Sequence, residues 1–128
     1  MRNPMKNRQI YEAALRLLAE STVDGENEDY EERAPYILAA FCTEMTALSR
    51  HLSAKNGNEY DPVFLPLDDT FPLAGRLSAA ATMYLAAMLI LESDEERSDK
   101  LYAQYCDAVS RISDEIPATI EPISNRYF

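Results

Sequence analysis

The sequence has no tryptophan, three glycines, one histidine and two cysteines in 128 residues. Three glycines cannot build the kind of Gly-rich loop that holds phosphate groups. The single histidine, His51, has no Glu or His three or four residues away, the spacing that metal-binding pairs use on a helix. A serine or cysteine nucleophile would also need His51 as its base, and no such pair is visible. We therefore expect no catalytic residues, no metal, no cofactor and no enzymatic activity.

Positive charge is also scarce, with 12 Lys and Arg against 22 Asp and Glu and a net charge of −10. An acidic surface repels phosphate, so we expect no specific binding of nucleic acid. The negative charge can serve solubility alone, or it can form a surface along which nucleic acid moves without binding. The sequence does not distinguish these two alternatives. The acidic residues concentrate in three stretches, 24–32, 59–69 and 92–99.

Long hydrophobic runs are absent, and crossing a bilayer takes about 20 apolar residues. The uncharged run from Leu77 to Leu91 is shorter, and it predicts a helix covered on most of its circumference, either the central helix of a bundle or a helix that also meets another subunit. The basic residues near the N-terminus are not followed by a hydrophobic signal core. Cys42 and Cys106 lie in apolar helical segments, so we expect both to be buried in a reducing compartment. We expect a cytoplasmic protein that does not enter membranes.

Helical periodicity covers most of the chain and predicts an all-α fold. We expect one four-helix bundle-like domain with helices over residues 4–20, 30–54, 73–92 and 94–116. The first, second and fourth helices each carry one apolar stripe. The stripe residues are Ile10, Ala14, Leu17 and Leu18, flanked by Tyr11 and Leu15, then Ala34, Leu38, Phe41, Met45, Leu48 and Leu52, then Leu101, Tyr105, Val109, Ile112 and Ile116.

Capping residues set the expected helix starts. Pro35 should bend the second helix or mark its true start, because proline removes a backbone donor. The expected caps are Asn3 followed by Pro4 for the first helix, Asp29 with Glu32 for the second, and Ser93 with Glu96 for the fourth.

Two segments outside the helices are the candidate interaction surfaces. The long loop between the second and third helices, residues 59–72, contains three prolines and many apolar side chains. It packs across its own bundle or reaches a neighbouring subunit, and both alternatives remain open. The extended C-terminal tail, residues 117–128, ends in two aromatic residues that dock on the same chain or on another. The candidate interaction residues are Val63, Phe64, Leu65, Leu67, Phe71, Tyr127 and Phe128.

Three segments in a fixed order carry a resemblance to known proteins: DYEERAP at 29–35, LPLDDTFPL at 65–73 and YLAAML at 84–89. Followed by an acidic cap and a helix containing Tyr105, they resemble small prophage-encoded proteins of Gram-positive bacteria. More distantly, they are similar to the head–tail connector proteins of tailed phages, also called adaptor or head-completion proteins. The resemblance implies a small helical bundle that assembles as a ring under the portal and extends the DNA channel towards the tail. It implies no individual binding residue.

Two functions follow from these observations. The first is a structural assembly protein resembling a head–tail connector subunit, which forms a homo-oligomer, has portal and tail-completion proteins as partners, and resides in the virion. The alternative is a cytoplasmic helical protein-binding module, such as a small acidic regulator or inhibitor whose acidic face meets a basic partner. Neither function involves catalysis.

Overall fold

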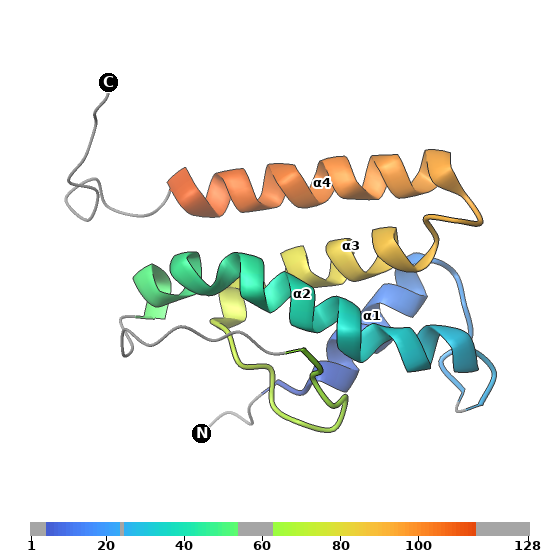
Figure 1. The fold of residues 1–128 in the computed structure, drawn as a ribbon. Helices are drawn as coiled ribbons and strands as arrows, with labels where there is room; N and C mark the ends of the chain where they lie inside the picture. The colour runs from blue at the N-terminus through green and yellow to red at the C-terminus, as the bar shows by residue number, and fades with distance from the viewer. Residues whose placement is uncertain (1–4, 24, 54–62, 115–128) are drawn as a thin grey trace.

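The computed structural model describes residues 5–23, 25–53 and 63–114, excepting the side chains of 47–53. The described residues form four α-helices, with a short 3₁₀ turn before the third and no strand (Figure 1). The predicted all-α, bundle-like fold is therefore confirmed. The elements are α1 (Asn7–Leu17), α2 (Glu28–Ser53), the 3₁₀ turn η1 (Gly75–Leu77), α3 (Ser78–Leu89) and α4 (Glu95–Asp114).

The third helix, α3, is the central element of the fold. It contacts α1, α2 and α4, and Figure 1 shows it between α4 and the other two helices. Its sequence is almost entirely Ala, Leu and Met, which favour helix and leave no polar face to turn towards water. The prediction of a covered central helix is confirmed. Its buried residues are Ala80, Ala81, Tyr84, Leu85, Ala86, Ala87 and Leu89.

The start of α1 is fixed by distant hydrogen bonds, and the predicted start at residue 4 is wrong. Residues 5 and 6 are not helical, while Asn3 and Pro4 lie outside the described residues. The amide of Asn7 donates to the Asp69 carbonyl at 2.9 Å, and that of Arg8 donates to Leu67 at 2.7 Å. These contacts satisfy two of the amides that every helix leaves unpaired at its N-terminus.

The start of α2 also differs from the prediction. Asp29 lies inside the first turn, and its carboxylate pairs with the Arg33 guanidinium at 3.1 Å instead of capping the helix with Glu32. Pro35 sits well inside α2, so it does not mark the start. The amide of Glu31 donates to the Asn27 carbonyl at 2.9 Å, which places the beginning of the helix before residue 30.

The connection between α3 and α4, residues 90–94, is longer than predicted, and α3 does not extend over 73–92. The amides of Ser93 and Asp94 both donate to the Ile90 carbonyl, at 3.0 and 2.8 Å. The Asp94 carboxylate then accepts a hydrogen bond from the Arg97 amide at 3.1 Å, so Asp94 rather than Ser93 caps α4. Residues 115 and 116, predicted as the end of this helix, lie outside the described residues.

Burial follows the predicted stripes in α2 and departs from them near helix ends. Ala34, Leu38, Phe41 and Met45 are buried as expected, whereas Leu48, Leu52 and Ile116 lie outside the described side chains. In α1 the stripe residue Leu17 is exposed, because the chain turns away directly after it. In α4, which packs mainly on α3, Val109 and Ile112 are half-buried and Cys106 is exposed, so Cys106 is not the core residue that was predicted.

Candidate functional site

The proline-containing loop, residues 63–72 as described, packs largely against its own chain. Its backbone is hydrogen-bonded at both ends: the Phe71 amide donates to the Met5 carbonyl at 2.7 Å, and the Leu65 amide donates to the Pro35 carbonyl at 3.1 Å. The side chains of Leu65, Leu67 and Phe71 are buried in the core. These three candidate interaction residues are therefore not on the surface, which corresponds to the alternative in which the loop crosses its own bundle.

A buried asparagine anchors the middle of this loop. The side chain of Asn7 is fully buried, and its Nδ2 donates to the Pro66 carbonyl at 2.9 Å. Beside it, the Arg8 guanidinium pairs with the Asp68 carboxylate at 2.9 Å and approaches Glu31 at 3.6 Å. The start of α1 thus holds the loop by backbone and side-chain contacts, so the surface that the loop presents is preorganised.

The remaining loop candidates form an exposed aromatic surface with a residue of α2. Val63 is 78% exposed and Phe64 is 47% exposed. The Phe64 ring meets the Tyr36 ring edge-to-face, with centroids 5.0 Å apart, and Tyr36 is itself 54% exposed. The hydrogen bond to Pro35 explains this pairing, because it sets Phe64 beside Tyr36. We call Tyr36, Val63 and Phe64 the aromatic ridge.

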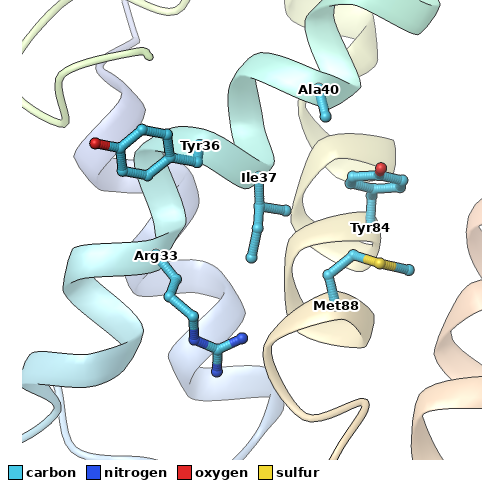
Figure 2. Close-up of a pocket in the computed structure, with 6 residues that line it drawn as sticks. All are labelled: Arg33, Tyr36, Ile37, Ala40, Tyr84 and Met88. Atoms are coloured by element: carbon cyan, nitrogen blue, oxygen red, sulfur yellow. The ribbon is translucent and has the colours of Figure 1, made fainter. Parts of the chain in front are cut away.

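The aromatic ridge adjoins an open groove between α2 and α3, the α2–α3 groove, of about 390 Å³. In Figure 2, Ile37 points into the space between the two helices, while Tyr36 points away from α3. The Arg33 guanidinium lies at one end of the groove, where its Nη2 donates to the Leu89 carbonyl at 2.9 Å. The groove is mainly apolar and is lined by Arg33, Tyr36, Ile37, Ala40, Tyr84 and Met88.

A cluster of aromatic rings supports the α3 side of this groove. The Tyr84 ring lies 5.7 Å from Phe41 and 5.0 Å from Tyr105, measured between centroids. The Tyr105 hydroxyl donates to the Glu44 carboxylate at 3.0 Å and so links α4 to α2. Burial, together with this hydrogen bond and the Glu44 charge, raises the pKa of Tyr105 above its usual value. Burial and the Glu44 charge also raise the pKa of Tyr84. Both tyrosines therefore stay neutral near pH 7 and serve as packed supports.

A second open groove, of about 470 Å³, lies between α1 and α3. Like the first it is mainly apolar, but it has no aromatic side chain in its lining. We call it the α1–α3 groove, and it is lined by Ala13, Arg16, Leu17, Ala79, Thr82 and Met83.

The exposed carboxylates gather at the end of the bundle where α2 and α4 begin. Arg33 of α2 reaches the last turn of α3, and Nη2 of Arg97 in α4 donates to the Leu17 carbonyl of α1 at 2.6 Å. These two bonds link α2 to α3 and α4 to α1 at the end of the bundle where, in Figure 1, α2 and α4 begin and α1 and α3 end. The exposed acidic residues of this acidic end are Glu26, Glu28, Asp29, Glu32, Glu92, Asp94, Glu95, Glu96 and Asp99.

Within residues 5–23, 25–53 and 63–114, no group of three or more His, Cys, Asp or Glu side chains is placed to hold a metal ion. Among the same residues, no helix is long and apolar enough to cross a membrane. Burial raises the pKa of the Cys42 thiol to about 12, so that thiol remains protonated.

Of the seven candidate interaction residues, Val63 and Phe64 lie together on the surface. Leu65, Leu67 and Phe71 are buried in the core. Tyr127 and Phe128 lie outside the described residues. Sequence analysis missed Tyr36, although its position off the apolar stripe of α2 already indicated an exposed aromatic side chain. Comparisons of the chain with protein-family models, curated proteins and solved structures found no match.

Proposed function

We propose that this chain is a structural assembly protein that associates with copies of itself, in the manner of the head–tail connector subunits that its sequence resembles. In that setting the portal and the tail-completion proteins are its further partners, and catalysis is not part of its role. The observation that carries the proposal is the aromatic ridge, in which Val63 and Phe64 of the loop are exposed together with Tyr36 of α2.

The aromatic ridge has the chemistry of an interface anchor. Aromatic residues are enriched at protein interfaces, where a few of them supply most of the binding energy. Exposed apolar residues standing singly are ordinary, but two residues of a preorganised loop grouped with Tyr36 of α2 suit a surface that a partner covers. Because the loop is already ordered by its hydrogen bonds to Met5 and Pro35, little conformational entropy is lost when a partner binds.

Light scattering of the full chain from micromolar to near-millimolar concentration tests self-association. We expect the mass to rise above that of the 14.5 kDa monomer. Phe64→Ser should raise the apparent dissociation constant at least about thirtyfold, which corresponds to about 2 kcal/mol lost from a central anchor. Tyr102→Ser is the matched control, since Tyr102 is also an exposed aromatic residue whose ring lies close to a second ring, that of Tyr105. A chain that remains monomeric throughout contradicts the proposal.

The acidic end favours a second candidate function, a protein-binding module that recognises a basic partner. Opposite charges across an interface accelerate association, and salt weakens the attraction between them. Under this alternative the acidic end, rather than the aromatic ridge, is the contact surface. Binding to a candidate basic protein should then fall steeply between low and physiological salt, and replacing Glu95 and Glu96 by Gln should weaken it. If neither the salt concentration nor the two substitutions change the affinity, the alternative is contradicted.

A further inference from the structure

We propose that the C-terminal segment of this chain, residues 115–128, docks in the α2–α3 groove of the same molecule. The inference goes beyond the proposed function, since it concerns what covers an open apolar groove in the single subunit. It rests on the lining of the groove, on the composition of the segment, and on the position of Asp114, where the described part of α4 ends.

The groove is suited to an extended apolar peptide. Ile37, Ala40 and Met88 form an apolar surface, and Tyr36 and Tyr84 also belong to the lining, with the Tyr36 ring directed away from α3 (Figure 2). Proline-containing segments prefer extended conformations and commonly bind grooves lined with aromatic rings. The α1–α3 groove is of similar size, but without an aromatic ring it lacks this feature.

The segment has the matching composition. Its two prolines exclude a regular helix across it and favour extended backbone. The segment also contains three isoleucines, one of them before the first proline, and two aromatic residues at its end. The residues that would occupy the groove are Ile116, Pro117, Ile120, Pro122, Ile123, Tyr127 and Phe128.

The segment is long enough to reach the groove on its own molecule. Tyr105 of α4 contacts Tyr84, which lines the groove, with ring centroids 5.0 Å apart. Asp114 lies nine residues further along α4, about 14 Å at the helical rise per residue. The fourteen residues that follow can span about 46–50 Å when extended. Returning to Tyr84 and crossing the groove therefore uses only part of the available length.

Attachment to the same chain favours this molecule over a neighbouring copy. A short flexible connection gives the segment an effective concentration in the millimolar range. A neighbouring copy at micromolar concentration competes at a disadvantage of about a thousandfold. In a dilute subunit the segment therefore docks within its own molecule.

Tyr127→Trp tests the proposal in the full chain, because the protein has no other tryptophan. We expect emission at shorter wavelength, and weaker quenching by acrylamide, than in the same variant unfolded by urea. This first comparison requires only the spectra of the folded and the unfolded variant. Emission at the unfolded wavelength in the folded protein overturns the proposal.

Two matched substitutions then identify the groove. Ala40 and Ala79 are both exposed helical alanines, but Ala40 lines the α2–α3 groove and Ala79 lines the α1–α3 groove. In the Tyr127→Trp background, Ala40→Glu should shift the emission towards the unfolded value and Ala79→Glu should not. The opposite pattern, or no response to either change, overturns the proposal.

Dilution and proteolysis complete the test. Docking within one molecule predicts emission that is independent of protein concentration, whereas emission that changes on dilution indicates a neighbouring copy and overturns the proposal. In the chain without the tryptophan, mass spectrometry can follow tryptic cleavage after Arg126. Ala40→Glu should accelerate this cleavage about tenfold, because cleavage follows the population of the undocked segment. An unchanged cleavage rate contradicts docking. Self-association through Phe64 is measured separately by light scattering, so the outcome of one test does not decide the other.

Discussion

Replacing Ala19 by glycine should stabilise the protein, which is unusual for an Ala→Gly change. Ala19 has φ +60°, in the left-handed region that L-residues seldom occupy. It follows the last turn of α1, where its amide donates to the Arg16 carbonyl at 3.1 Å and the Glu20 amide donates to Leu15 at 2.8 Å. These two bonds are the pair that closes a helix in a Schellman motif, in which glycine is the preferred residue.

The size of the effect follows from two opposing terms. The left-handed conformation costs a residue with a Cβ atom about 1–2 kcal/mol, and glycine avoids that cost. Glycine also loses more conformational entropy on folding, and this reduces the gain in stability by about 0.5–1 kcal/mol. Ala19 is exposed, so the substitution leaves no cavity in the core. The net expectation is a gain of about 0.5–1 kcal/mol, or a rise in Tm of roughly 2–4 °C.

Urea unfolding and thermal melting followed by circular dichroism measure this difference. The matched control is Ala40→Gly, which makes the same change at an exposed position inside α2. There the expected result is a loss of about 1 kcal/mol, because alanine favours a helix interior and glycine does not. Opposite signs at the two positions support the geometry at the end of α1. A loss at Ala19 similar to that at Ala40 refutes it.

Three further predictions concern the core, the loop anchor and the thiols. Leu85→Asp should abolish cooperative melting, because Leu85 is completely buried and the new charge has no partner; an unchanged Tm would show that α3 is not central. Asn7→Asp should cost about 1–3 kcal/mol in urea unfolding, since the group that donates to Pro66 becomes an acceptor; an unaffected midpoint contradicts the anchor. A thiol reagent near neutral pH should label exposed Cys106 and spare Cys42, whose pKa burial raises to about 12; equal labelling rates without urea contradict the assignment.

The parts of the fold that could be predicted are those set by local periodicity. The stripe through Ala34, Leu38, Phe41 and Met45 repeats at helical spacing, so burial of one member requires burial of the others. The uncharged run that became α3 has no polar face, and it is covered by all three other helices. Neither inference needs knowledge of which distant segment supplies the contact.

The helix ends could not be predicted in the same way, because partners distant in sequence determine them. The amide of Asn7 is satisfied by Asp69, and this bond, not a cap at Asn3, accompanies the first helical residue. At the other end of α1 the left-handed residue is Ala19, where a sequence pattern would look for glycine. The cap of α4 is Asp94 and not the predicted Ser93. The two residues are adjacent and both are suitable caps, so the pattern of polar residues does not distinguish between them.

The candidate interaction surface was predicted as a segment but not residue by residue. Composition indicates that an apolar loop packs against something, and the loop does contribute both to the core and to the surface. Which side chains turn inward depends on how the loop crosses the bundle, and the bond from Leu65 to Pro35 helps to decide this. It leaves Phe64 outside beside Tyr36, a neighbour that periodicity alone could not assign to the loop.

The distribution of charge also bears on the choice between the two functions. The acidic end coincides with the N-termini of α2 and α4, where carboxylates oppose the positive end of each helix dipole and contribute about 0.3–1 kcal/mol apiece. Asp94 caps α4, and Asp29 pairs with Arg33, so part of the acidity already has a role within the chain. The rings of Tyr36 and Phe64 contact each other but both side chains remain about half exposed. A partner that covers the aromatic ridge therefore explains more of this surface than a basic partner at the acidic end.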